Sequence, residues 1–233
     1  MKARIIGMAL CGLSPLISAG AIYDVGFEEP IYTNGATITE GSSPDMPSYA
    51  NAVTVTSNPG DMTSQAALFG SGSALGFYTG VQTAGLIEYS WDFVAMSLSG
   101  SLPLFQMGVV IDVFSSSDLV WVEYLSNQNI RFSCYGISQM NVATFTLGET
   151  QSYLLRADLD NDLLSFYIDG TPIVENQALP SDWDPYTINF ATGMSASPSY
   201  ALDNLSVVSI PEPSTIALFA LGIPLLLARF RRK

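Results

Sequence analysis

Short runs of hydrophobic residues alternate with polar clusters along most of this 233-residue chain, a pattern that predicts β-strands. The runs are rich in β-branched and aromatic residues, and turn-forming clusters such as SSSD, SNQN and DND separate several of them. Strands are predicted at residues 86–98, 105–114, 119–125, 130–137, 142–148, 152–159, 163–170, 186–192 and 201–209. Many short strands at a spacing of roughly ten residues indicate an all-β fold, an antiparallel β-sandwich.

Residues 34–64 are looser than the rest of the body. Ser, Thr, Asn, Gly and Pro are frequent there, which predicts a long surface loop with one strand at residues 52–56. Between residues 22 and 209 no stretch keeps a helical period over ten residues. We therefore expect one β domain over residues 22–209, without an internal repeat.

The first 21 residues have the pattern of a secretory signal peptide. Lys2 and Arg4 precede an uncharged, apolar run, and small residues follow at positions 18–21, where cleavage is expected. The run is too short for a convincing membrane-spanning helix. The pattern predicts export by the Sec pathway.

Residues 210–233 carry a second apolar run, and here the basic residues follow the run instead of preceding it. After the sequence Pro211-Glu212-Pro213, residues 214–228 form an uncharged, mostly apolar stretch that would cover about 22 Å as a helix. A basic cluster ends the chain and is expected to stay on the cytoplasmic side of the inner membrane. Its charged members are Arg229, Arg231, Arg232 and Lys233.

The tail IPEPSTIALFALGIPLLLARFRRK resembles the PEP-CTERM sorting signal of bacterial surface proteins. The resemblance implies recognition by an exosortase at Pro211, Glu212 and Pro213, with the terminal basic residues acting as a membrane stop until processing. It also implies a Gram-negative bacterium, transient tethering in the inner membrane, and a final place at the cell surface or in the extracellular matrix. Proteins with this signal are often associated with exopolysaccharide and biofilm.

The charge of the body excludes some classes of partner. Residues 22–209 hold 20 acidic residues against two arginines, Arg131 and Arg156, a net charge of −18. Such a surface repels nucleic acid and anionic lipid, which bind basic patches. The chain has no histidine, which removes the usual general base and zinc ligand. Cys134 lies in a strand-like stretch, where a buried and inert thiol is expected.

Several short motifs in the body resemble laminin-G-like, concanavalin-like jelly rolls. The hairpin YLLRADLDNDLLSFYIDGTPI contains the turn Tyr167-Ile168-Asp169-Gly170, and VGFEEP and YALDNLSVVS resemble the first and last strands of such domains. The resemblance implies that the terminal strands lie together. An immunoglobulin-type or carbohydrate-module sandwich is the alternative.

Concanavalin-like folds include glycoside hydrolases, which need two carboxylates about 5–10 Å apart across a cleft. Glu88 and Asp92 share strand parity, and Trp91 points to the opposite face. Residues four apart on a strand are about 13 Å apart, so this spacing does not make a catalytic pair. We therefore expect a protein that is not an enzyme.

Two further candidate sites have weak support in the sequence. Asp158, Asp160 and Asp162 have the spacing of the first ligands of a calcium loop, but Leu163 stands where that loop needs glycine. A bare hairpin turn explains the same residues, so no cofactor is expected and calcium is kept as the alternative. Trp183, in the loop sequence PSDWDPY, is the candidate for an exposed ring that stacks on a sugar.

Three functions remain open from the sequence. The first is an exosortase-processed surface or matrix protein whose β-sandwich binds an exopolysaccharide, another surface glycan or a protein partner. The second is a carbohydrate-active enzyme on the same fold. The third is a purely structural coat component.

Overall fold

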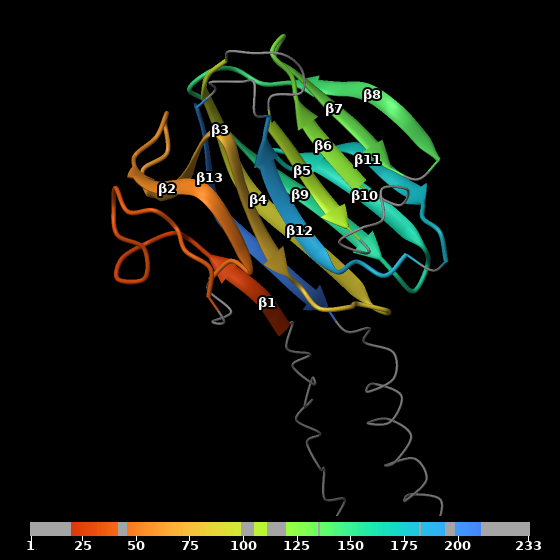
Figure 1. The fold of residues 1–233 in the computed structure, drawn as a ribbon. Helices are drawn as coiled ribbons and strands as arrows, with labels where there is room; N and C mark the ends of the chain where they lie inside the picture. Colours follow the sequence, from red (N-terminus) through yellow and green to blue (C-terminus); the bar gives the residue numbers. More distant parts are fainter. Residues whose placement is uncertain are drawn as a thin grey trace, which may run out of the picture. The chain divides into compact units, whose positions relative to one another are not determined.

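The structure is a computed structural model that describes residues 20–41, 46–98, 105–110, 120–134, 136–181, 183–193 and 199–210. Among these residues all regular secondary structure is β-strand, as the sequence predicts, and they form one compact unit (Figure 1). The strands are β1 (Gly20–Val25), β2 (Tyr49–Ser57), β3 (Gln65–Tyr78), β4 (Leu86–Ser97), β5 (Phe105–Val110), β6 (Val120–Tyr124), β7 (Asn129–Cys134), β8 (Ile137–Thr144), β9 (Thr150–Asp158), β10 (Leu163–Ile168), β11 (Thr171–Ala178), β12 (Thr187–Thr192) and β13 (Ser199–Ile210).

All strand pairs are antiparallel, and they join into one hydrogen-bonded sheet that folds over on itself into a sandwich. The strand order is β11-β10-β9-β4-β13-β3-β12-β5-β6-β7-β8, with β1 also paired to β13 and β2 to β3. We call β11, β10, β9, β4, β13 and β1, with the first half of β3, sheet I. Sheet II consists of the second half of β3 with β12, β5, β6, β7 and β8, and with the first residues of β2, which pair with this half of β3. Figure 1 shows β12, β5 and β6 lying over β4 and β9.

β3 belongs to both sheets because it changes partners along its length. Residues 67–69 pair with β13, whereas residues 74–78 pair with β12. Between them Gly72 has a φ of 67°, a left-handed conformation that suits glycine. The hydroxyl of buried Ser73 donates to the Ala52 carbonyl at 2.6 Å, and its amide donates to the hydroxyl of Thr192 at 2.8 Å. These bonds satisfy polar groups that the change of partner removes from the sheet ladder.

The core between the sheets is built largely from aromatic side chains. Phe93 of sheet I lies 4.0 Å from Tyr124 and 4.9 Å from Phe105 of sheet II, measured between ring centroids. It also lies 5.5 Å from Tyr200 and 6.3 Å from Tyr153 of its own sheet. All five side chains are at most 1% exposed. Phe93 therefore couples the two sheets, because it contacts rings from both.

Most of the predicted strands are present, with four differences. β3 and β11 have no predicted counterpart, and the strand predicted at residues 142–148 lies earlier, at β8. Gly136, with a φ of 74°, makes the turn that starts β8 directly after β7. The strand expected in VGFEEP is also earlier, because β1 ends at Val25. The strand predicted at residues 52–56 is confirmed by β2.

The first and last strands pair, as expected from the jelly-roll resemblance. Residues 20–25 of β1 run antiparallel to residues 205–209 of β13. The predicted signal peptide and the apolar tail lie outside the described residues, and the described part contains no helix that is long and apolar enough to cross a membrane. Cys134 is 7% exposed, and burial raises the pKa of its thiol to about 11, which agrees with an inert thiol.

Replacing Phe93 by alanine is expected to lower the free energy of unfolding by about 3–5 kcal/mol, since it removes a ring from a filled core. Urea denaturation of the full chain followed by tryptophan fluorescence measures this loss. Leu147→Ala is the control, because this side chain is 41% exposed. Equal losses in the two variants would contradict the coupling role of Phe93.

Candidate functional site

The outward face of sheet II carries a row of directly paired residues that crosses five strands from β2 to β6. The pairs are Tyr49 with Gly76, Gly76 with Asn189, Asn189 with Gly108, and Gly108 with Trp121. Directly opposite residues in a sheet have their side chains on the same face. The alternation of burial along β12 places Asn189 on the outward face, because Ile188 and Phe190 are in the core. We call these five residues the cross-strand row.

Both glycines of this row lie beneath a neighbouring side chain. A Cβ atom at Gly108 would lie 2.7 Å from Cζ3 of Trp121, so the indole ring lies against the backbone of β5. A Cβ atom at Gly76 would collide with Oδ1 of Asn189 in the same way. The absence of side chains at these two positions therefore lets Trp121 and Asn189 lie close to the sheet.

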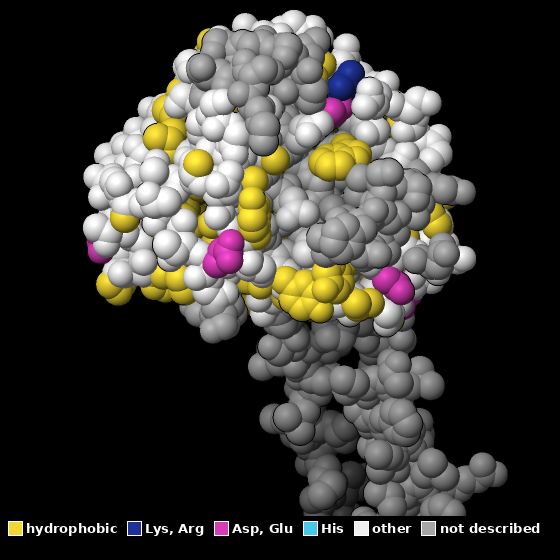
Figure 2. Space-filling view, viewed as in Figure 1, with side chains coloured by type: hydrophobic (Ala, Val, Ile, Leu, Met, Phe, Trp, Pro, Cys, Tyr) yellow, Lys and Arg dark blue, Asp and Glu magenta, His cyan; other side chains and the backbone are white. Residues whose placement is uncertain are grey.

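One end of the row opens into a cavity of about 520 Å³ that is mostly apolar. Tyr78 is 43% exposed and Tyr49 is 50% exposed, and the rings of Tyr78 and Tyr186 meet edge to face at 4.3 Å. Figure 2 shows hydrophobic side chains gathered over this end of β3 and β12. The residues that line the cavity are Ser48, Tyr49, Gly76, Tyr78, Tyr186, Thr187 and Asn189.

Local backbone contacts hold this aromatic cluster in place. Ser48 donates its amide to the Gly76 carbonyl at 2.8 Å, and its hydroxyl accepts from the Tyr78 amide at 2.9 Å. The Thr79 amide donates to the carbonyl of Tyr186 at 2.9 Å. The two tyrosine-bearing segments are therefore fixed to each other by their main chains.

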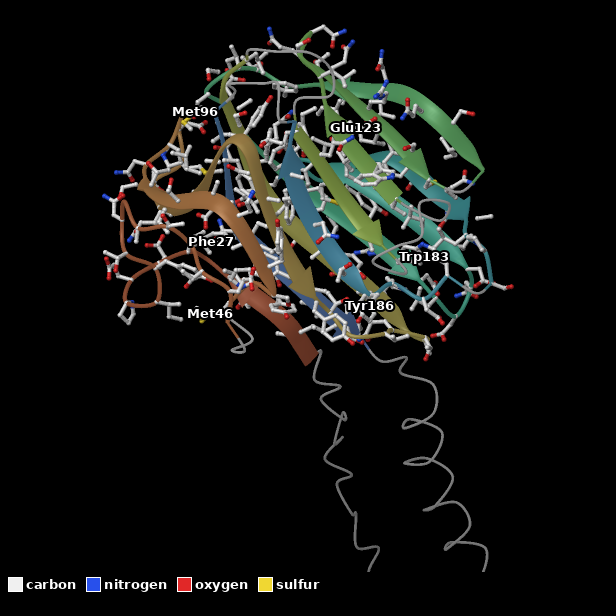
Figure 3. The ribbon with its side chains drawn as sticks, in the orientation of Figure 1. Phe27, Met46, Met96, Glu123, Trp183 and Tyr186 are labelled. Atoms are coloured by element: carbon white, nitrogen blue, oxygen red, sulfur yellow. The ribbon has the colours of Figure 1, made fainter. Side chains whose placement is uncertain are left out.

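A polar network lies beside the cross-strand row, two residues further along β5 and β6. Gln106 donates its amide to Glu123 at 2.8 Å, and Arg131 donates Nε to the other Glu123 oxygen at 2.6 Å. Glu123 is 4% exposed, so these two partners replace the water that would otherwise solvate its carboxylate. Figure 3 shows Glu123 on sheet II, well separated from Tyr186.

Sheet I has a second, smaller pocket of about 200 Å³ on its outward face, where the β2–β3 loop lies over β4 and β13. Asp92 and Asp203 are direct partners on these two strands. Asp92 accepts from Ser152 at 2.5 Å and from Asn204 at 2.8 Å. Asp203 is only 1% exposed and accepts from the hydroxyl of Ser64. The pocket therefore brings two carboxylates together whose positions in the sequence are 111 residues apart.

Burial raises the pKa of Asp203 to about 6. The carboxylates of Glu28 and Asp92 act in the same direction, because a nearby negative charge disfavours ionisation. Hydrogen bonds from the Ser64 hydroxyl and the Asn204 backbone act in the opposite direction. Asp203 is thus ionised at neutral pH at a cost to the folded state.

The predicted arrangement of β4 is confirmed, because Trp91 is buried while Glu88 and Asp92 lie on the outward face. Glu88 is engaged by Arg156, with Oε1 to Nη2 at 2.6 Å.

The Asp158–Asp162 segment forms a turn whose acids accept local hydrogen bonds. Asp158 accepts from the amide and the side chain of Asn161, and Asp160 accepts from the Gly85 amide at 3.0 Å. In the described part of the chain no three acidic or cysteine side chains are grouped so as to hold a metal ion. Calcium binding at Asp158, Asp160 and Asp162 stays a prediction.

The exposed ring expected at Trp183 is wrong. Trp183, labelled in Figure 3, is 4% exposed and packs in the main core cluster. Its amide donates to the Pro180 carbonyl at 3.1 Å, a short turn that directs the ring inward. The prolines and acids around it signal a loop, but a loop can still contribute a core residue. The predicted sorting residues Pro211, Glu212 and Pro213, and the basic cluster after them, lie outside the described residues.

The tyrosines of the cavity were not among the residues singled out from the sequence. Tyr78 follows Leu75 and Phe77, both buried, so its exposure could have been read from the alternation in LGFY once β3 was recognised as a strand. Tyr49 and Tyr186 lie outside such a pattern, because each stands at or beyond the end of its strand.

Comparison with known proteins gives one match in sequence and many in fold. Residues 209–233 match the PEP-CTERM protein-sorting motif, which marks exported proteins that an exosortase processes. No curated protein matches the chain. The tail resemblance is therefore confirmed, and these sequence comparisons give no function for the body.

Solved structures of carbohydrate-active proteins share the fold of the body. Alginate lyase AlgAT5 of polysaccharide lyase family 7 has a TM-score of 0.52 at 14% identity, covering 76% of this chain and 93% of that one. Domain 4 of AbnA, an arabinanase from Geobacillus stearothermophilus solved with arabinotriose, has a TM-score of 0.50 at 13% identity, covering 85% and 97%. A sialidase has a TM-score of 0.51 at 11% identity over 67% of this chain, which spans only 17% of that protein. At these identities the likeness shows an antiparallel β-sandwich.

Substituting Asp203 by asparagine is expected to change the pH dependence of stability. The folded-state pKa of about 6 is above the ordinary value of an aspartate, so the wild type loses stability as pH rises through this window. The loss is about 2–3 kcal/mol between pH 4 and pH 7. Urea unfolding of both proteins across this range, in chelator, measures the difference, with exposed Asp24→Asn as the control. Parallel curves for the wild type and Asp203→Asn would contradict the effect.

Proposed function

We propose that the body of this exported protein binds a glycan through the outward face of sheet II. The observation that carries this proposal is the cavity of about 520 Å³ with its three tyrosines. Cavities of this size, mostly apolar and with a few polar groups, are typical of small-ligand sites. Tyrosine rings offer flat apolar faces to the C–H groups of a sugar, and their hydroxyls offer hydrogen bonds.

The polar groups of the cavity suit hydroxylated ligands. The Asn189 side chain has two donors and an acceptor, and the hydroxyls of Ser48 and Thr187 both donate and accept. A sugar presents alternating hydroxyl groups and apolar faces, so it can use both kinds of surface. The complex of the arabinanase domain with arabinotriose gives independent support, since a protein of this fold holds a short neutral oligosaccharide.

We propose that binding is not coupled to catalysis. The pocket on sheet I, which is lined by the carboxylates of Asp61, Asp92 and Asp203, favours the alternative of a carbohydrate-active enzyme. However, Asp203 is 1% exposed and both Asp92 oxygens accept hydrogen bonds from neighbours. Asp92 and Asp203 are therefore not presented to a glycosidic oxygen, which a general acid must reach, and exposed Asp61 alone does not supply the two carboxylates that hydrolysis requires.

The glycan proposal fits the destination of the chain. An exosortase is the processing partner that the sorting motif implies. We propose that the processed body remains at the cell surface or in the matrix, where exopolysaccharide is the available polymer. A purely structural coat component is the remaining alternative, and it predicts no measurable affinity for any glycan.

Substituting Tyr78 by alanine is expected to weaken glycan binding about tenfold, because one stacking face of the cavity is lost. Isothermal titration of the full chain against arabinotriose and a panel of neutral trisaccharides measures the affinity. The control is Tyr167→Ala, a partly exposed tyrosine on sheet I. If no glycan of the panel and no host exopolysaccharide binds the wild type, the proposed function is wrong.

A further inference from the structure

We infer that the site continues from the tyrosine cavity along the cross-strand row to Trp121, and that it takes an extended segment of a neutral polysaccharide. This inference rests on the proposed function and names the class of glycan and its direction across the sheet. The cavity and Trp121 are joined by an unbroken series of paired residues on one face, from Gly76 through Asn189 and Gly108.

The length of the row argues for a chain of several sugars. Neighbouring strands are about 4.8 Å apart, so the four steps from Tyr49 to Trp121 span about 19 Å. A single sugar fills only one end of such a surface. An aromatic ring stands at each end, and the Asn189 amide lies between them.

The two glycines keep the side chains of Asn189 and Trp121 close to the sheet, so that a ligand can lie along this surface. With a side chain at Gly108, the indole of Trp121 would have to move away from β5. Because the position is glycine, the ring lies against the strand while the residue stays partly exposed. A ring that lies along a sheet presents a broad face, which is the geometry that stacking on a sugar requires.

The charges of this face favour a neutral polymer. Between residues 22 and 209 the cations are Arg131 and Arg156, and each is already in an ion pair, with Glu123 and Glu88. An anionic glycan such as alginate would need cationic partners. It would also approach a body with a net charge of −18.

Hydrogen-bonding groups next to the row suit the hydroxyls of a neutral sugar. Gln106 uses one amide N–H on Glu123, which leaves its carbonyl and its second N–H available. Direct pairing of Gln106 with Glu123 and of Glu123 with Arg131 fixes this network two residues from Gly108 and Trp121. The network can therefore orient a sugar that stacks on the indole.

The test is the dependence of affinity on chain length. Linear arabino- and xylo-oligosaccharides of two, three, four and six units are titrated into the full chain, with alginate oligosaccharides of the same lengths in parallel. We expect affinity for a neutral series to rise at least tenfold from two to six units, and alginate to bind at least tenfold more weakly. Trp121→Ala should remove this rise with chain length.

Further variants separate the loss of stacking from a loss of folding. Trp121→Phe keeps an aromatic ring and should restore part of the length dependence. Gly108→Ala keeps the tryptophan but displaces it, and should act like Trp121→Ala. Near-ultraviolet circular dichroism reports whether each variant retains its packed core. Tyr78→Ala should weaken binding at every length, because it acts in the cavity.

The outcomes distinguish this inference from the proposed function. Binding of neutral oligosaccharides that is independent of length, or unaffected by Trp121→Ala in a folded variant, would overturn the extended site and leave glycan binding intact. Preferential binding of alginate would overturn the neutral class. No binding of any oligosaccharide or of host exopolysaccharide would overturn both proposals.

Discussion

The sandwich depends on a single strand that serves two sheets. β3 pairs with β13 over its first half and with β12 over its second, and the change occurs around Gly72. Because of this change, β3 joins sheet I to sheet II both through its own chain and through its hydrogen bonds. The buried hydroxyls of Ser73 and Thr192 lower the energetic cost of this change, because they form hydrogen bonds with backbone groups that would otherwise be buried without partners. The face that holds the candidate site starts directly after this point, at residues 74–78.

Sequence patterns predicted the fold class and most strands because large β-branched and aromatic residues dominate those segments. β4 and β9 are examples, with alternation that matches their buried and outward faces. β3 could not be predicted in this way, since its sequence QAALFGSGSALGFY is rich in Ala, Gly and Ser. β3 is paired with other strands on both edges, so its strand conformation depends on tertiary structure more than on its own residues.

The candidate site was less predictable than the fold, because it depends on register. Nothing in the local sequence around Trp121 tells that Gly108 lies opposite it, or that Asn189 comes next in the same row. Trp183 illustrates the same limit in the other direction, since its polar neighbours suggested exposure while its ring is in the core. The sorting tail was predictable for the opposite reason. It is a linear motif, and residues 209–233 match it by their sequence alone.

The position of the last strand has a mechanical consequence. β13 is an interior strand that pairs with β4 from Ser199 to Ile210 and with β1 along its second half, and the sorting motif follows it directly. Hydrogen bonds between antiparallel strands run perpendicular to the strand direction. A pull on Ile210 along the axis of β13 would load its bonds to β4 in shear, so that many would have to break together instead of one after another. The strand that leads into the sorting motif is therefore held by hydrogen bonds on both of its edges.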